Sequence, residues 1–436
     1  MKHVHLLGGR IAAALIGCAI LFAARLVSAQ TAESTVTPSN STLLLQFPPL
    51  SGSYAVGRAF MALDDSARAE VFTDDANDTR RIPVTFYYPI DAATASAATA
   101  PAATAYIPEN IRGPFAQALG FPPTLFAQIG AHASDNAPAA SSDQGFPVLL
   151  FSPGFGVALP LYTSLLEQVA SHGYVVAAID HPYSQSISFF PDGSSVTQNA
   201  AGTNLNDETN NRLIGQVWTD DTRAVLDWLQ TLNASDPVLT GALDLTKNGA
   251  FGHSFGGAAA VRIMVEDARV QATIDIDGSL MLDSIGTAIS GPVLMMRSVE
   301  TASQMDGTSA PTEAQIAEIL SQNNMTREQY DQLMQQAVDS TEALRTAPQL
   351  TEMIVADTVH LSYVTDLPLI RTALPILPES LTGSVDPYRL LTVVTDTTVG
   401  FFNQELLGQN GAFDAIVSGA NADGAYPELS LVPNES

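Results

Sequence analysis

The chain has 436 residues and a formal net charge of −27, with 46% apolar and 14% charged residues. This apolar content supplies a large folded core and excludes an intrinsically disordered chain. So acidic a surface repels phosphate backbones and anionic bilayers, which excludes nucleic acid as a partner. The length fits either one large α/β domain or two or three smaller ones.

The first 29 residues have the organisation of an export signal. A basic start precedes the apolar stretch 11–24, and residues 27–29 (Val-Ser-Ala) offer a small-residue cleavage site. Arg25 interrupts the apolar run, which disfavours a membrane-spanning helix of about 20 residues. We therefore predict a signal peptide over residues 1–29 and a secreted or periplasmic protein, with an uncleaved anchor as the alternative.

The single cysteine, Cys18, lies within this signal. Residues 15–18 (Leu-Ile-Gly-Cys) resemble a bacterial lipoprotein processing site, but the apolar run continues past Cys18. Lipid anchoring at Cys18 is therefore the less favoured alternative. Cleavage after residue 29 would remove the only cysteine, which excludes disulfides, cysteine catalysis and thiolate metal sites from the exported chain.

The first third of that exported chain shows few regular elements. Residues 30–45 are rich in Ser, Thr and Pro and indicate a flexible leader. Residues 81–89 alternate apolar and polar side chains, which predicts a half-buried strand. We expect a surface loop over 91–105, a helix over 107–128 and a second loop over 132–145.

From Phe146 onward, strands and helices alternate, which is typical of a parallel, doubly wound sheet. The expected strands cover 148–151, 174–179, 248–251, 272–276, 292–296 and 353–356, and the expected helices cover 161–171, 211–231, 257–266 and 386–407. Two further helices interrupt this alternation at 312–346. Each opens with a capping-box pattern, Thr-Glu-Ala-Gln at 312–315 and Thr-Arg-Glu-Gln at 326–329.

Residues 252–256 (Gly-His-Ser-Phe-Gly) match the motif G-x-S-x-G. A short apolar strand precedes them and an Ala-rich helix follows, which is the setting that exposes a nucleophilic serine in the α/β-hydrolase fold. The flanking glycines allow the tight turn that this setting requires. We therefore predict an α/β-hydrolase fold with Ser254 as the nucleophile; the alternative is a Gly-rich loop with a structural serine.

A serine hydroxyl needs a base, and in this fold the partners follow in the order Ser, acid, His. His360 is the only histidine after Ser254, and it lies in a loop after a late strand. Asp277 ends a predicted strand at the catalytic edge of the sheet and is the preferred acid. Glu300, after the next strand, and Asp275, deeper on the same strand, stay open as alternatives.

Two backbone N–H groups would stabilise negative charge on the substrate carbonyl oxygen. Phe255 supplies the first, at the start of a helix. Phe155 supplies the second, in the loop 152–156 (Ser-Pro-Gly-Phe-Gly) after an early strand; a plain turn is the alternative for this loop. No set of His, Asp or Glu residues has metal-ligand spacing, so we expect neither a metal nor another cofactor.

With these residues in place, the chain resembles the secreted, plasma-type platelet-activating factor acetylhydrolase family. The similar segments are FSPGFG (151–156), ASHGYVVAAIDHPYSQS (170–186), GHSFGG (252–257), the IDIDG that contains Asp277, and TVHLSYVTD (358–366). The resemblance implies a triad of Ser254, Asp277 and His360, with oxyanion donors at Phe155 and Phe255. It also implies hydrolysis of short or oxidised acyl chains from phospholipids without calcium.

The chain departs from this family in two places. Pro153 stands where many relatives have a histidine, and the insertion 312–346 is long, so lipid specificity stays open. The pair Asp180-His181 resembles an acid–His pair of the family and is expected to shape the pocket. The alternatives are a general carboxylesterase or lipase, a polyester hydrolase if Glu300 is the acid, and a non-catalytic binding protein.

The expected organisation is one catalytic domain over 46–410 with the helical insertion 312–346, followed by a C-terminal tail over 411–436. The expected ligand is a small-molecule or lipid ester. Contacts with lipid aggregates would be transient, and no stable protein partner is implied.

Overall fold

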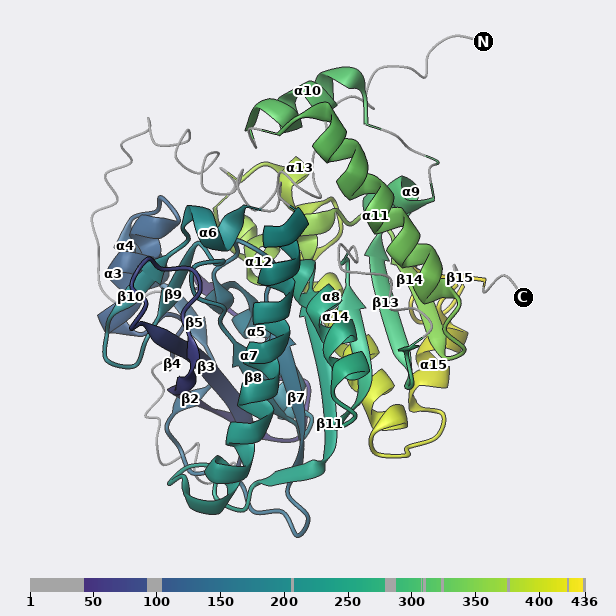
Figure 1. Cartoon of the computed structure of the whole chain (residues 1–436). Coiled ribbons are helices and arrows are strands. Elements are labelled where there is room, and N and C mark those ends of the chain that lie inside the picture. Colours follow the sequence, from purple (N-terminus) through teal and green to yellow (C-terminus); the bar gives the residue numbers. More distant parts are fainter. Residues whose placement is uncertain are drawn as a thin grey trace.

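A computed structural model describes residues 43–91, 104–204, 208–278, 288–306, 308, 311–322, 325–374, 377–421 and 423–433. The predicted signal peptide and nearly all of the predicted leader lie outside these residues. A ten-stranded sheet runs through the molecule with helices on both sides (Figure 1).

The strands follow the order β15-β14-β13-β12-β11-β7-β8-β3-β2-β6 across this sheet. From β8 to β14 all neighbours run parallel, whereas β15, β3 and β2 join through antiparallel pairs. The strands are β2 (Ala55–Ala69), β3 (Thr79–Ile90), β6 (Ser134–Asp135), β7 (Phe146–Ser152), β8 (Val175–Ile179), β11 (Leu243–His253), β12 (Val270–Ile276), β13 (Val293–Ser298), β14 (Leu350–Val355) and β15 (Leu429–Val432). The predicted doubly wound, mostly parallel sheet is confirmed.

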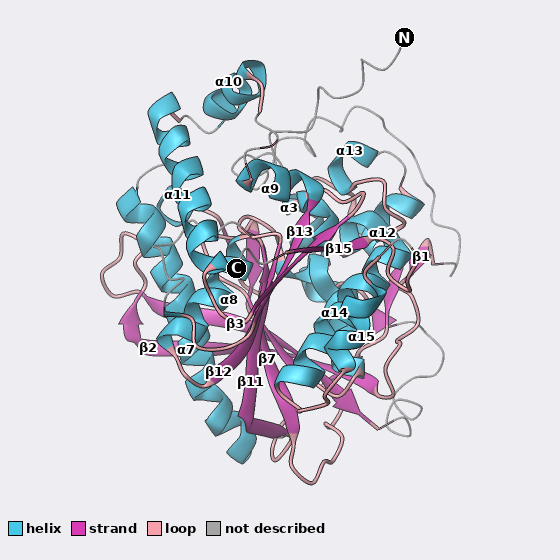
Figure 2. Ribbon diagram, turned by 90° about the vertical axis from the view of Figure 1, so that its right-hand side faces the viewer, coloured by secondary structure: helices cyan, strands magenta, loops and turns pink. Residues whose placement is uncertain are grey.

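Helices on both faces bury the parallel strands. The main helices are α5 (Thr163–Ser171), α7 (Glu208–Ser235), α8 (Phe255–Glu266), α14 (Pro387–Glu405) and α15 (Ala412–Gly419). Figure 2 shows the sheet between α7 and α8 on one side and α14 and α15 on the other. In β7, Leu149 and Phe151 join one apolar cluster and Val148 and Leu150 join the other. Burial on both faces explains why this strand reads as a continuous apolar run.

The remaining elements surround this sheet. They are β1 (Leu45–Gln46), β4 (Thr104–Ala105), β5 (Ile129–Ala131), β9 (Ile187–Phe189), β10 (Ser195–Thr197), α3 (Glu109–Ala118), α4 (Pro123–Phe126), η1 (Leu159–Tyr162), α6 (Ala200–Thr203), α9 (Val299–Met305), α10 (Glu313–Gln322), α11 (Arg327–Arg345), η3 (His360–Tyr363), α12 (Asp366–Ala373) and α13 (Glu379–Thr382). Helix α11 begins with the predicted capping box, in which the Thr326 hydroxyl accepts from Gln329 N.

The prediction of a C-terminal tail over 411–436 was wrong for its described part. Helix α15 packs on α14, and β15 pairs antiparallel with β14. Leu429 is buried in the core opposite Val355. Without β15, the backbone groups on that side of β14 would need another partner. The predicted leader likewise ends early, because Leu45 is buried and pairs with Ile129 in β5.

Other differences fall in the first third of the chain. The 15-residue strand β2 has no counterpart among the predicted elements. The helix expected over 107–128 is two helices. The first ends before Gly120, which adopts a positive φ of 73°, and the second begins at Pro123, a residue that favours the first position of a helix. The loop expected over 132–145 contains the short edge strand β6.

Candidate active site

Ser254 occupies a tight turn between β11 and α8. Its backbone has φ 57° and ψ −125°, a conformation that residues other than glycine rarely adopt. The Ser254 N–H donates to Ile276 O at 2.9 Å, which ties the turn to β12. A Cβ atom on Gly252 would lie 2.6 Å from the carbonyl oxygen of Ser152, so only glycine fits there. The turn leaves the Ser254 hydroxyl partly exposed at the carboxyl edge of the sheet.

His360 begins η3, just after β14, and its imidazole lies between two partners. The Nε2 atom is 2.9 Å from Ser254 Oγ, and Nδ1 is 2.9 Å from Asp277 Oδ2. An ionised carboxylate can only accept, so the proton belongs on Nδ1 and Nε2 is free to accept the Ser254 proton. Ser254, Asp277 and His360 thus lie in one hydrogen-bonded chain.

Asp277 is fully buried and accepts three further hydrogen bonds at the start of α9. Ser298 donates from its N–H (2.6 Å) and its hydroxyl (3.0 Å), and Thr301 donates from its hydroxyl (3.0 Å). Burial raises the pKa of Asp277, but the hydrogen bond and charge of His360, together with the Ser298 N–H, outweigh burial and hold that pKa below its usual value. Asp277 is therefore ionised at neutral pH.

The two alternative acids do not contact the imidazole. Glu300 lies in the first turn of α9 and faces the His360 backbone N–H, but neither carboxyl oxygen makes a well-formed hydrogen bond within the described residues. Burial and the charge of Asp277 raise the pKa of Glu300 to about 8, so it is neutral at pH 7. Asp275 instead accepts from Gly278 N at 2.9 Å, and burial raises its pKa to about 7.

The loop that contains Phe155 is anchored on both sides of that residue. Gly154 N donates to Tyr162 Oη at 3.0 Å, and Gly156 N donates to Ser184 O at 3.0 Å. Within the described part of the chain, the Phe155 N–H has no protein acceptor. The rings of Phe155 and Phe255 lie 5.7 Å apart, so this loop packs against the start of α8.

The sequence profile of the family described as platelet-activating factor acetylhydrolase, isoform II, matches residues 40–423. The chain belongs to this family. Among curated relatives, a probable 1-alkyl-2-acetylglycerophosphocholine esterase from Arthroderma benhamiae is 29% identical over 292 residues. A platelet-activating factor acetylhydrolase from Cavia porcellus is 28% identical over 173 residues. These alignments cover 61% and 35% of this chain, and 67% and 39% of the relatives.

A ferulic acid esterase from Streptomyces cinnamoneus has a similar solved structure. The superposition has a TM-score of 0.66 at 24% identity and covers 89% of this chain and 99% of the esterase. Identity at this level shows the fold alone. The predicted α/β-hydrolase fold is confirmed, and this member of the acetylhydrolase family is a serine ester hydrolase.

The site of this family member contains a second histidine, His253, that sequence reasoning treated only as part of the motif. Its Nε2–H donates to the carbonyl oxygen of His360 at 3.0 Å, and its Nδ1 accepts from Tyr162 Oη at 2.8 Å. Burial and the neighbouring His360 lower the pKa of His253 to about 3, so the ring is neutral. Tyr162 and His253 thus connect Gly154 to the backbone of His360. No sequence pattern signals Tyr162.

The adjacent residues Asp180 and His181, expected to shape the pocket, have different side-chain partners. Asp180 accepts from Ser188 Oγ at 2.8 Å, whereas His181 pairs with Asp221, 40 residues later. Asp180 lines a cavity of about 270 Å³ between η1, α3 and β9, with Tyr87, Tyr106 and Phe189 among its walls. Burial raises the pKa of Asp180 to about 7.

Among the described residues, no group of three or more His, Cys, Asp or Glu side chains is arranged to hold a metal ion. Within the same residues, none of the helices combines the length and the apolar composition that crossing a membrane requires.

Proposed function

We propose that this acetylhydrolase-family member cleaves carboxylic esters with short acyl groups through an acyl-enzyme on Ser254. The observation that carries this proposal is the hydrogen-bonded chain from Ser254 Oγ through His360 to Asp277, with 2.9 Å at each step. Nucleophile–base and base–acid distances of this size are what general-base activation of a serine requires.

In the proposed first half-reaction, His360 Nε2 takes the Ser254 proton while Oγ attacks the ester carbonyl. Asp277 keeps the imidazole in the productive tautomer and stabilises the imidazolium that forms. The backbone N–H groups of Phe155 and Phe255 donate to the oxyanion of the tetrahedral intermediate. The imidazolium then protonates the leaving alkoxide, and the acyl group stays on Ser254.

In the second half-reaction, His360 activates a water molecule that attacks the acyl-enzyme through the same oxyanion site. The carboxylic acid leaves and Ser254 recovers its proton. Every proton in this scheme moves through one imidazole nitrogen, His360 Nε2, and no cofactor takes part.

The proposed substrate is a glycerophospholipid with a short acyl group at the sn-2 position. Family membership supports this substrate, because the relative from Arthroderma benhamiae is described as an esterase of 1-alkyl-2-acetylglycerophosphocholine. The net charge of −27 favours a zwitterionic head group over an anionic one. Contact with lipid aggregates would then be transient. A general carboxylesterase is the second candidate, since the proposed triad chemistry does not depend on the alcohol.

We propose that the protein is exported by means of the signal at residues 1–29, which lies outside the described residues. The amino-terminal sequence of the exported protein tests this proposal. We expect it to begin at Gln30. A mature chain that begins at a lipid-modified Cys18 would instead support membrane anchoring.

Initial rates on a series of esters test the substrate. The series comprises p-nitrophenyl acetate, butyrate and octanoate, a 2-acetylated glycerophosphocholine and a polyester film, with Ser254→Ala as the control. We expect kcat/KM to fall as the acyl chain lengthens and to be highest on the phospholipid. Equal rates on all soluble esters would favour the general carboxylesterase, and preferential release from the film would favour the polyester hydrolase.

A further inference from the structure

A second chain of Ser, His and Asp side chains lies beneath the loop that contains Phe155. Ser152 Oγ, at the end of β7, is 3.1 Å from His181 Nε2, just after β8. His181 Nδ1 is 2.9 Å from Asp221 Oδ2 on α7. The exposed fractions of Ser152, His181 and Asp221 are only 5%, 0% and 0%.

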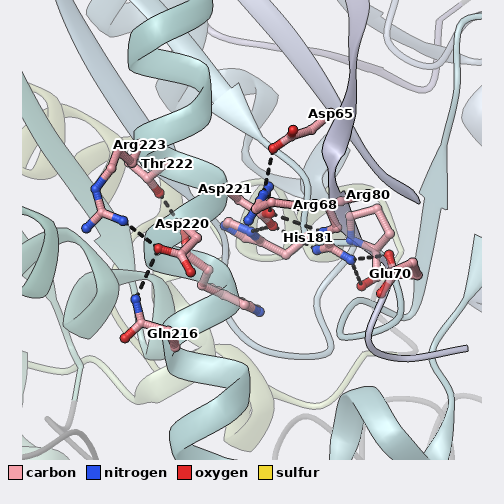
Figure 3. Close-up of polar contacts among 12 residues, drawn as sticks. Asp65, Arg68, Glu70, Arg80, His181, Gln216, Asp220, Asp221, Thr222 and Arg223 are labelled. Carbon is pink, nitrogen blue, oxygen red and sulfur yellow. Dashed lines mark hydrogen bonds and ion pairs between the residues drawn. The ribbon is translucent and has the colours of Figure 1, made fainter. Parts of the chain in front are cut away.

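Two arginines hold the Asp221 carboxylate in its charged form (Figure 3). Arg80 donates to it from Nε (3.1 Å) and Nη2 (2.7 Å), and Arg68 donates from Nη2 at 2.8 Å. Glu70 and Asp65 balance these arginines, at 2.8 Å from Arg80 and 2.6 Å from Arg68. Burial raises the pKa of Asp221, but the charge of Arg80 and the bonds from His181 and Arg80 outweigh burial and hold that pKa well below its usual value.

The direction of each hydrogen bond in this chain follows from these charges. Burial lowers the pKa of His181, so its ring is neutral. Asp221 can only accept, which places the His181 proton on Nδ1 and leaves Nε2 as an acceptor. Ser152 therefore donates its hydroxyl proton to His181, and its side chain is held in one orientation.

Ser152 has the hydrogen-bond partners of a nucleophilic serine, but its hydroxyl is not accessible to a substrate. It is buried, and it does not line the cavity of about 270 Å³ beside Asp180. No substrate carbonyl can reach its hydroxyl without displacing packed residues. This hydrogen-bonded group of Ser152, His181 and Asp221 is therefore suited to fixing the positions of neighbouring residues rather than to attacking an ester.

These three hydrogen-bonded residues lie against the side of the site where the oxyanion would form. Ser152 directly precedes the Pro-Gly-Phe segment that ends at Phe155, and its carbonyl oxygen lies against Gly252 of the nucleophile turn. Trp218 stacks on the His181 ring, with centroids 4.0 Å apart and 12° between the planes. The same indole packs edge-on against Phe255 at 4.9 Å and lies 6.3 Å from Phe155.

We propose that Ser152, His181 and Asp221 are positioning residues that hold the Phe155 N–H in place to receive the oxyanion. This inference rests on the proposed function, because it assigns these residues to the same ester hydrolysis. Ser152 sets the start of the loop, and His181 braces Trp218 against Phe155 and Phe255. The arginine-bound Asp221 anchors both residues to α7 and to the sheet edge.

Kinetics of Ser152→Ala and His181→Asn test the proposal, with Thr219→Val as the matched control. Thr219 is equally buried on α7, and its hydroxyl donates to Gly215 O, within its own helix, at 2.9 Å. On p-nitrophenyl acetate we expect each test variant to lose about 10- to 100-fold in kcat, because a displaced oxyanion donor costs somewhat less than a deleted one. KM should stay within about threefold, and Thr219→Val should match the wild type.

Two further readouts separate an effect on the oxyanion from an effect on the base. An aryl trifluoromethyl ketone forms an oxyanion on Ser254, so its Ki should rise by the same factor as kcat/KM falls. The pH profile of kcat/KM should keep its acid limb, because His360 and Asp277 are unchanged. Phosphonate labelling should stay at one site per chain, on Ser254.

Several outcomes would overturn the proposal. Full kcat in both test variants, an equal loss in Thr219→Val, a shifted acid limb, or a phosphonate on Ser152 would each do so. If His181→Asn does not fold, Ser152→Ala carries the test, since it removes only one hydroxyl. A failure of the proposed function itself looks different, because the wild type would then hydrolyse no ester faster than Ser254→Ala does.

Discussion

Replacing Asp277 with asparagine changes one atom at the centre of the site. The Ser298 N–H, 2.6 Å from Oδ1, can only donate, so the asparagine oxygen must stay on that side. The NH2 group then takes the position of Oδ2, which faces His360 Nδ1 at 2.9 Å. The hydroxyls of Ser298 and Thr301 can rotate to accept from the amide, so the fold should survive.

The expected loss of activity follows from the tautomer that this amide imposes. An NH2 group that faces Nδ1 makes that nitrogen an acceptor, which moves the His360 proton to Nε2. Nε2 then points a proton at Ser254 Oγ and cannot act as a base, and no negative charge remains to stabilise the imidazolium. We expect kcat to fall by about 10⁴, which corresponds to about 5.5 kcal/mol in the barrier.

Initial rates on p-nitrophenyl acetate at pH 7 measure this loss, and circular dichroism checks the fold. Glu300→Gln is the matched control, because it makes the same carboxyl-to-amide change at a neighbouring buried acid in the first turn of α9. Glu300 is already neutral at pH 7 and does not contact the imidazole, so its variant should stay within about threefold of the wild type. A mild Asp277→Asn together with a crippling Glu300→Gln would refute the reasoning and favour the polyester or lipase alternative.

The remaining predictions concern the nucleophile, the pH dependence of stability and the role of metals. Ser254→Ala should fold normally and lose about a million-fold in kcat; a variant that keeps a tenth of the rate would exclude the proposed mechanism. Burial lifts the pKa of Glu300 from its ordinary 4.5 to about 8, so the folded state binds its proton more tightly, and this contribution to stability is lost as the pH rises between those values. The Tm of Glu300→Gln relative to wild type should therefore increase from pH 5 to pH 8, and a constant difference would contradict the assigned burial of Glu300. Hydrolysis should be insensitive to EDTA, because the proposed steps use only side chains and backbone N–H groups; loss of turnover that one metal ion restores would argue against them.

Much of the fold and of the candidate site could be predicted from the sequence because the relevant signals are local. The nucleophile turn is a short glycine-flanked motif between an apolar strand and a helix, and Ser254 stands out within it. His360 is the only histidine that follows. The doubly wound sheet follows from alternating strands that are apolar on both faces, as in β7, since burial on both sides leaves a continuous apolar run.

Other features depended on the distances between side chains in the folded protein, which cannot be read from the sequence. Asp275 lies near the end of β12, Asp277 follows β12 and Glu300 follows β13, so only their distances to the imidazole decide which one reaches His360. The partner of His181 is Asp221 on α7 rather than its neighbour Asp180. The strand β15 is only four residues long, too short for its alternation to stand out.

Periodicity and turn chemistry act within a few residues, so the sequence by itself determined the parallel strands and most of the helices that pack on them, the nucleophile turn and the chain order of the candidate residues. A hydrogen bond forms only when two atoms come within about 3 Å in the right orientation. Asp277 is 83 residues and Ser254 is 106 residues away from His360 in the sequence. These side chains come within that distance only once the sheet and its helices have packed. The tertiary structure therefore decided which acid faces the imidazole and which loop residues are held beside it.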